Sequence, residues 1–379
     1  MTPSARLQAA IDLLDAIIAA ATGQGAAADT LIARYFKERR YAGSKDRRAV
    51  RDLVYLAIRA HADAPASGRA AMLTLAARDE ALAALFDGSA HGPAPVGPDE
   101  SPATTATEPV PDWLLPLLSP LIDASERAAL LARAPLHIRV NAAKASRDSL
   151  LASLADAAPV PGTPHGIALP EGMALEALPE WQAGLIDVQD AGSQMIAAAC
   201  AARPGQTVLD LCAGAGGKTL ALAADMGGEG RLIAADISRD RLARLRPRAE
   251  RAGATHIETL LLDAGREAAM LAPLNGACDV VLVDAPCTGM GTWRRNPEAR
   301  WRIAPPMLAR TTAQQAAILR LAAPLVRDGG TIVYAVCSLL DPEGRDQVDA
   351  FLAEYPGWSA EPAGPQGRIW GAGRLLSPA

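Results

Sequence analysis

The chain has 379 residues, half of them hydrophobic and 21% charged, which excludes a disordered, collagen-like or disulfide-scaffold protein. One domain takes roughly 100–200 residues, so the length predicts two or three domains. The net charge of −5, from 37 Lys and Arg against 42 Asp and Glu, does not by itself indicate a nucleic-acid-binding protein.

The cysteines and apolar segments indicate neither a metal site nor a membrane span. The five cysteines lie far apart, with no CxxC or Cys/His cluster. The apolar stretch 16–21 is short and follows two aspartates, unlike a signal peptide, and no run approaches the roughly 18 apolar residues that span a bilayer. We expect a cytoplasmic protein that holds no metal and acts as a monomer.

Residues 1–87 are predicted to form an all-helical domain. Apolar residues recur at spacings of three and four, as on one face of a helix, in two segments: Leu7, Ile11, Leu14 and Ile18, then Val50, Leu53, Val54 and Ile58.

A basic stretch, residues 34–51, lies within this domain. It carries eight Lys and Arg against Glu38 and Asp46, with Tyr35, Phe36 and Tyr41 interleaved. One interpretation is a solvated helix face with core aromatics. The other is a phosphate-binding surface with stacking groups, and the contrast with the acidic whole chain favours this RNA contact.

Residues 88–112 are predicted to be a linker, because they hold six Pro and three Gly in 25 positions. Residues 113–183 are predicted to be a small α+β module that binds RNA. We expect it to contain a helix over 113–133, a strand over 137–140 and a helix over 147–155.

Residues 184–379 are predicted to form a doubly wound, Rossmann-like α/β domain. Apolar strand-like runs at 207–212, 231–236, 257–263, 279–284 and 331–337 alternate with helical stretches. This alternation is typical of a parallel sheet covered on both faces.

The first of these strands leads into a glycine-rich turn, Cys212-Ala213-Gly214-Ala215-Gly216-Gly217-Lys218-Thr219. A P-loop would need Gly at position 212, and a dinucleotide fingerprint would need Gly at position 219. The remaining pattern, D-x-x-x-G-x-G-G from Asp210, is the form used for S-adenosylmethionine. We therefore expect the cofactor to contact residues 212–218.

Acids end the predicted strands: Asp210, Asp236, Asp263 and Asp284. Because ligands bind outside the carboxyl ends of the strands in an open parallel sheet, these acids should converge on one crevice. Asp236 is placed to accept hydrogen bonds from a ribose diol. The cofactor contacts are thus predicted to be residues 212–218 with Asp236, Asp263 and Asp284.

Two cysteine motifs follow the fourth and fifth predicted strands. They read Asp284-Ala285-Pro286-Cys287-Thr288-Gly289-Met290-Gly291 and Val336-Cys337-Ser338-Leu339. With these motifs, the glycine-rich turn, Val188-Gln189-Asp190 and the segment 41–47, nearly the whole chain resembles the Sun/RsmB (NOP/Sun) family of RNA (cytosine-5) methyltransferases, in its bacterial ribosomal-RNA branch.

The resemblance implies methyl transfer from S-adenosylmethionine to carbon 5 of cytosine in RNA, with 16S ribosomal RNA as the expected substrate. Carbon 5 is a poor nucleophile, so a thiolate must first add at carbon 6. The family precedent assigns this thiolate to Cys337 and product release to Cys287. Asp284 can hydrogen-bond the cytosine edge, and Lys218 either assists there or has a structural role at a helix start. Asp341 and Pro342 are predicted to start a helix that would lower the thiol pKa of Cys337.

The chain departs from the family in several places. Ala215 stands where Pro is usual, and Val336 where Thr is usual. The helical region is shorter than in the ribosomal-RNA branch. The family ends in a Gly-Phe-Phe strand, whereas this sequence stops at Ala379, so we expect the sheet to lack its last strand.

Other classes of methyltransferase need sequence motifs that differ from those found here. DNA cytosine-5 enzymes place the nucleophile in a Pro-Cys-Gln motif, but Thr288 follows Cys287, and Cys337 is a second thiol. Amino-group methyltransferases need Pro-Pro-aromatic after the acid. The alternatives left open are a cytosine-5 methyltransferase acting on tRNA and a non-catalytic RNA-binding ribosome assembly factor.

Overall fold

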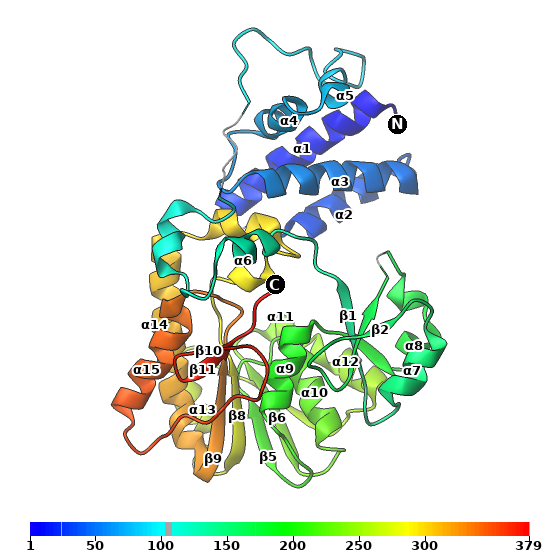
Figure 1. Ribbon diagram of the computed structural model, residues 1–379. Coiled ribbons are helices and arrows are strands. Elements are labelled where there is room, and N and C mark those ends of the chain that lie inside the picture. The colour runs from blue at the N-terminus through cyan, green and yellow to red at the C-terminus, as the bar shows by residue number, and fades with distance from the viewer. Residues whose placement is uncertain (24, 103–107, 171, 379) are drawn as a thin grey trace.

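The computed structural model describes residues 1–23, 25–102, 108–170 and 172–378. A group of helices forms the upper part of the molecule in Figure 1, and an α/β region with a small lateral module forms the lower part. No helix of the described residues is long and apolar enough to cross a membrane.

The N-terminal helices pack around one apolar core, as the helical periodicity predicts. They are α1 (Pro3–Thr22), α2 (Ala28–Glu38), α3 (Ser44–Ala60), α4 (Gly68–Ala76) and α5 (Glu80–Ala83). The Thr2 hydroxyl caps α1 by accepting from the Ala5 N–H. Leu7 and Leu14 of α1 are buried together with Val54 and Ile58 of α3.

Part of the predicted linker 88–112, residues 103–107, lies outside the described residues. The described part runs back along α4, where Arg69 donates to the Glu100 carboxylate and to the carbonyls of Ala94 and Pro95.

The helix predicted over 113–133 is wrong. The structure has a 3₁₀ helix, η1 (Asp112–Leu117), and a short α6 (Ala124–Ala129). Pro116 and Pro120 lack the N–H donors that a continuous α-helix needs, which explains the interruption.

The lateral module is a four-stranded antiparallel sheet in the order β2-β3-β1-β4. Its strands are β1 (Leu136–Val140), β2 (Ala158–Pro159), β3 (Gly166–Leu169) and β4 (Ile186–Val188). They pack with α7 (Arg147–Ser153), η2 (Leu175–Ala177) and α8 (Pro179–Gln182).

The main sheet confirms the predicted Rossmann-like α/β fold. Five parallel strands lie in the order β7-β6-β5-β8-β9. Their bounds are β5 (Thr207–Asp210), β6 (Arg231–Asp236), β7 (Ile257–Leu261), β8 (Cys278–Asp284) and β9 (Val326–Ala335).

Helices cover both faces of this sheet, so its strands are buried on both sides. Val208 packs into the core under α10 and α12, and the next residue, Leu209, packs into the opposite core under α13 and α14. The covering helices are α9 (Ala191–Ala199), α10 (Gly217–Asp225), α11 (Arg239–Leu242), α12 (Leu245–Ala252), α13 (Glu267–Leu271) and α14 (Pro305–Ala322).

The end of the chain forms a separate hairpin of β10 (Arg368–Trp370) and β11 (Gly373–Leu375) after α15 (Arg345–Glu354). In the described part of the chain, β9 is therefore the edge of the parallel sheet, as the sequence predicts. The remaining 3₁₀ turns are η3 (Ala272–Leu274), η4 (Met290–Thr292), η5 (Pro297–Arg302), η6 (Ala323–Leu325) and η7 (Asp341–Glu343).

One of these turns, η5, docks the helical region onto the α/β region. Arg300 is 1% exposed and donates to the carbonyls of Ile58 and His61, which end α3. Glu298, 2% exposed, accepts from the Ala28 N–H at the start of α2. A cation at the last carbonyls of a helix and a carboxylate at the first N–H of another are both favourable.

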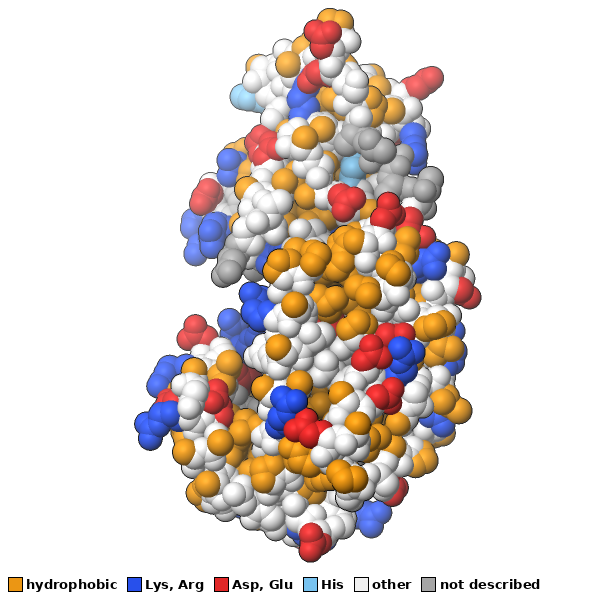
Figure 2. Space-filling model, turned by 90° about the vertical axis from the view of Figure 1, so that its left-hand side faces the viewer, with side chains coloured by type: hydrophobic (Ala, Val, Ile, Leu, Met, Phe, Trp, Pro, Cys, Tyr) orange, Lys and Arg blue, Asp and Glu red, His pale blue; other side chains and the backbone are white. Residues whose placement is uncertain are grey.

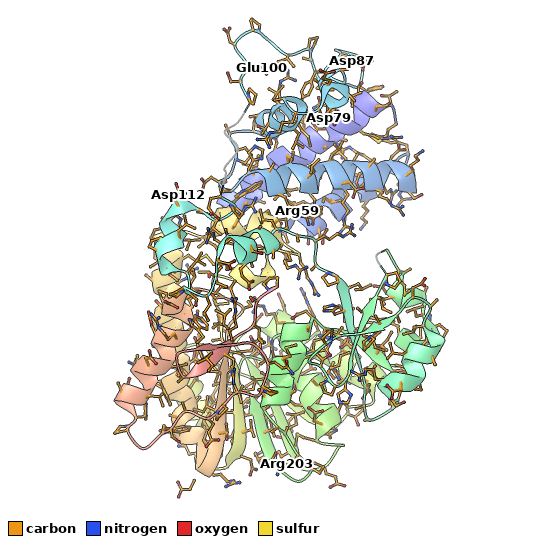
Figure 3. The ribbon with its side chains drawn as sticks, viewed as in Figure 1. Arg59, Asp79, Asp87, Glu100, Asp112 and Arg203 are labelled. Carbon is orange, nitrogen blue, oxygen red and sulfur yellow. The ribbon has the colours of Figure 1, made fainter. Side chains whose placement is uncertain are left out.

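Replacing Arg300 with Met should undo this docking, because it leaves buried carbonyls without a donor. We expect the free energy of unfolding to fall by about 1.5–3 kcal/mol, the range for hydrogen bonds to a charged group. Scanning calorimetry measures the change. The matched control is Arg203→Met, since Arg203 is exposed and lies at the far end of the molecule (Figure 3). Equal stability of the two variants would contradict the docking role.

Candidate active site

The predicted cofactor residues 212–218 form the turn between β5 and α10. Gly214 has φ 55° and Gly216 has φ 80°, in the left-handed region that favours glycine. A Cβ at Gly216 would also collide with Leu245. Glycine at these two positions is therefore needed for the shape of the turn. It also lets a ligand approach the backbone of the turn closely.

Asp236, at the end of β6, lies directly against this turn. Its Oδ2 accepts from the Gly214 N–H at 2.7 Å, and its Oδ1 accepts from the Ser238 N–H at 2.7 Å. Each carboxylate oxygen has a second lone pair for a ligand hydroxyl. Burial, together with the charges of Asp210 and Asp236, raises the pKa of the Cys212 thiol, so Cys212 contributes to the turn as a neutral side chain.

The four strand-end acids do not share one environment. Asp210 is 1% exposed, and burial raises its pKa to about 7 while the Thr219 hydroxyl donates to it at 2.6 Å. Asp263 lies two residues beyond β7, with its side chain 60% exposed and paired with Arg266. Asp263 is thus joined to Arg266, whereas Asp210 anchors the start of α10.

Asp284, at the end of β8, binds the cofactor turn through Lys218. The Lys218 Nζ and Asp284 Oδ2 atoms are 2.6 Å apart, and the lysine side chain is 13% exposed. Burial lowers the pKa of Lys218, but the Asp284 charge and hydrogen bond outweigh burial and raise it. The structure therefore joins these two predicted residues in one partly buried ion pair.

The two predicted thiols face each other across neighbouring loops. The Sγ atoms of Cys287 and Cys337 are 3.3 Å apart, a donor–acceptor contact. The hydrogen bond with Cys287 lowers the pKa of Cys337, burial and the charge of Asp284 oppose this lowering, and the charge of Lys218 adds to it. The same hydrogen bond, together with burial, raises the pKa of Cys287. The contact therefore favours ionisation of Cys337 over ionisation of Cys287.

The helix start predicted at Asp341 and Pro342 is wrong. These residues begin the 3₁₀ turn η7, and α15 starts only at Arg345. The Asp341 carboxylate accepts from Trp370 Nε1 at 2.7 Å instead of capping a helix. The lowered pKa of Cys337 has the causes given above and does not come from a helix N-terminus.

Two groups of polar contacts were not singled out by the sequence patterns. Gln189 connects the lateral module to the cofactor turn, since it accepts from the buried Arg139 at 2.7 Å and donates to the Gly217 carbonyl. Its only sequence signal is its place in the family-like segment 188–190. Glu343 binds the loop that carries Cys287 and is 0% exposed.

A hollow of about 310 Å³ lies at the start of the lateral module. Arg133 and Arg295 line it, together with Leu136 and Val188. The charges of Arg295 and Lys218 both lower the pKa of Asp190, although burial opposes them. Arg295 of the hollow and Lys218 of the site therefore both act on Asp190, and two arginines give the hollow a positive lining.

The basic stretch 34–51 lies in α2, α3 and the turn between them. Phe36 belongs to the helical core, whereas Tyr41 is 74% exposed. Arg39 stacks on Tyr35, 3.7 Å from the ring centroid. Arg40 and Arg48 are exposed. Figure 2, which faces the α14 and α15 side, shows an indentation between the upper and lower parts of the molecule with Lys and Arg side chains beside it.

Comparison with known proteins identifies relatives. A family model described as 16S rRNA methyltransferase RsmB/F matches residues 197–372. The chain is 35% identical over 270 residues to a Synechocystis protein named "Probable ribosomal RNA small subunit methyltransferase B", covering 68% of this chain and 60% of that protein. It is 36% identical over 228 residues to ribosomal RNA small subunit methyltransferase B of Salmonella typhi, covering 59% of this chain and 52% of that protein.

A solved structure has the same fold. The structure titled "Crystal Structure of PH0851" superposes with a TM-score of 0.69 at 22% identity, covering 94% of this chain and 91% of that chain. The chain spans little more than half the length of the curated relatives that it matches. These matches confirm the resemblance drawn from the motifs.

The thiol pair predicts an order of alkylation. A thiol with a lowered pKa ionises at lower pH, so iodoacetamide should modify Cys337 with a midpoint at lower pH than Cys287. Cys287→Ala removes the donor and should move the Cys337 midpoint to higher pH, measured by peptide mass spectrometry. The control, Cys200→Ala, removes a buried thiol elsewhere. An unmoved midpoint in Cys287→Ala would show that the contact does not ionise Cys337.

Proposed function

We propose that this member of the Sun/RsmB family transfers a methyl group from S-adenosylmethionine to carbon 5 of a cytosine in small-subunit ribosomal RNA. The observation that carries the proposal is the pair of thiols 3.3 Å apart, whose pKa values are shifted in opposite directions, beside the Lys218–Asp284 ion pair. A lone buried cysteine is usually a small core residue, but two facing thiols at adjacent strand ends form a reactive centre.

The turn and its acid suit the methyl donor. Gly214 and Gly216 let the backbone approach a ligand closely, and the α10 N-terminus follows at Gly217. Asp236 can accept hydrogen bonds from a ribose diol while it holds Gly214. S-adenosylmethionine supplies an electrophilic methyl group. We assign Asp284 to the same crevice, and Asp263 to its rim because its side chain is exposed.

The reaction needs a nucleophile that bonds to the cytosine ring before methyl transfer and leaves the ring afterwards. In the proposed mechanism the Cys337 thiolate adds to carbon 6 of cytosine, and the displaced electron pair lets carbon 5 take the methyl group. S-adenosylhomocysteine is the leaving group of the methyl transfer. A water molecule then takes the carbon 5 proton, and the electron pair of that bond expels the Cys337 thiolate. Cys287 assists this second step from 3.3 Å. Asp284, oriented by Lys218, hydrogen-bonds the cytosine edge.

The substrate is proposed to lie along the positive surfaces. The exposed arginines of the stretch 34–51 and the Arg133–Arg295 hollow are suited to RNA phosphates, which arginine binds in bidentate fashion. A base must leave its stack to reach the thiols, which favours a loop or an unpaired nucleotide as the target.

The two thiols have different roles, so their variants should fail differently. Cys337→Ala should abolish turnover and form no covalent RNA adduct, because the first bond cannot form. Cys287→Ala should still add and methylate, and should accumulate a protein–RNA complex that is retarded on a denaturing gel. The double variant should resemble Cys337→Ala. An adduct with Cys337→Ala alone would reverse the assignment, and activity in both single variants would exclude the covalent mechanism.

Asp236→Ala should weaken binding of S-adenosylmethionine by about 1.5–3 kcal/mol, because the variant has no charged acceptor for the ribose hydroxyls. Titration calorimetry on the folded variant measures the change. Asp240→Ala, which removes an exposed acid in the following helix, is the matched control. Unchanged affinity of Asp236→Ala would remove this residue from the site.

Replacing Arg39, Arg40, Arg47 and Arg48 with Gln, or Arg295 alone with Gln, should weaken RNA binding. The slope of log affinity against log salt should flatten by up to about 0.7–0.9 for each phosphate that is no longer bound. Fluorescence anisotropy with labelled ribosomal RNA fragments gives both quantities. Arg203→Gln should leave both unchanged, and none of these variants should alter the affinity for S-adenosylmethionine. If RNA affinity and slope do not move, these arginines are only solvated surface.

A further inference from the structure

The buried carboxylate of Glu343 lies directly beneath the loop that carries Cys287. Its Oε1 accepts from the Thr288 N–H at 2.9 Å, and its Oε2 accepts from the Thr288 hydroxyl at 2.5 Å. On the other side it accepts from Thr311 at 2.8 Å and from Gln315 at 3.1 Å, both on α14. The carboxylate therefore ties the loop to a long helix.

Gln315 also forms a hydrogen bond to the residue before Cys287. Its Nε2 atom also donates to the Pro286 carbonyl at 2.8 Å. Both chain neighbours of Cys287 are thus held by one connected pair of side chains, Glu343 and Gln315. Since the backbone on either side of the thiol is held, the position of the Cys287 Cβ atom is fixed, and the Sγ atom has only the rotamers about one bond available.

The same loop is joined to the loop that carries Cys337. The Gly291 N–H donates to the Cys337 carbonyl at 2.9 Å, and the hydroxyls of Thr288 and Ser338 are 3.5 Å apart. The Glu343 backbone carbonyl, moreover, accepts from the Tyr334 hydroxyl at 2.7 Å, on the strand that leads to Cys337. Glu343 therefore forms hydrogen bonds both to the loop that carries Cys287 and to the strand that leads to Cys337.

Burying a carboxylate is costly, and here its four hydrogen-bond donors are all neutral groups. A helix and a loop could be joined more cheaply by apolar packing. We propose that Glu343 is a positioning residue that holds the Cys287 thiol against Cys337. The catalytic significance of this contact rests on the proposed function, but the placement itself does not.

The proposal makes a prediction about a thiol that Glu343 does not touch. Cys337 is faced by Cys287 from the loop, Asp284 from β8 and Lys218 from α10. Cys287 is faced by Cys337, Glu343 and Tyr334. If Cys287 swings away, Cys337 loses its hydrogen-bond donor and its pKa rises. Removal of a nearby negative charge alone would act in the opposite direction and lower it.

The test measures the pH midpoint of Cys337 alkylation in the full chain. Glu343→Gln keeps the volume and removes the charge, and Thr288→Val keeps the charge and removes the hydroxyl. Both should move the Cys337 midpoint to higher pH. Thr288→Ser retains the hydroxyl and should restore the wild-type midpoint. Thr312→Val is the matched control, because Thr312 is next to Thr311 but donates only to carbonyls of its own helix.

A midpoint that is unchanged or lower in both folded variants would overturn the proposal and leave Glu343 a purely structural residue. Neither RNA nor methyl donor is needed, so this outcome is separate from failure of the proposed function. With both substrates present, Glu343→Gln should also accumulate the covalent complex, as Cys287→Ala does. If the wild-type chain transfers no methyl group, the proposed function fails while the alkylation midpoints still decide the positioning.

Discussion

The contact between the Cys287 and Cys337 sulfurs is the interaction on which the account of this molecule depends. Two identical side chains in contact share one proton more readily than they hold two or none, and an asymmetric environment decides which of them ionises first. The sheet provides the contact, since β8 and β9 are neighbouring parallel strands whose carboxyl ends lie side by side. The surroundings differ as well, since Cys337 faces the Asp284–Lys218 pair and Cys287 faces Glu343.

The same stretch of chain that carries Cys287 also docks the helical region. After the loop come η4 and then η5, whose Glu298 and Arg300 bind the ends of α2 and α3. Trp293, fully buried between them, packs with Leu114 and Leu340. The position of the basic stretch relative to the thiols is therefore set by a short, well-packed segment.

The sequence allowed the fold and much of the site to be predicted because these depend on local patterns. Apolar runs such as 279–284 mark buried parallel strands, and Gly214 and Gly216 mark a turn with positive φ. The prediction of one helix over 113–133 failed because Pro116 and Pro120 interrupt the segment. Asp341 failed because a Pro after an acid fits a 3₁₀ turn as well as an α-helix.

Glu343 and Arg300 could not be found in this way. The partners of Glu343 lie 28 to 55 residues away, and those of Arg300 lie about 240 residues away. In the sequence, one is an acid after a proline and the other an arginine in a basic segment. Only the folded chain shows that both are buried and that each is surrounded by complementary groups.

The identity of the methylated nucleoside tests the central claim most directly. Small-subunit ribosomal RNA would be incubated with the chain and methyl-labelled S-adenosylmethionine, digested to nucleosides and analysed by chromatography with mass spectrometry. The account predicts label in 5-methylcytidine. Label in a base methylated on nitrogen, or in a 2′-O-methylated ribose, would contradict it, because neither product requires a thiol to add to carbon 6.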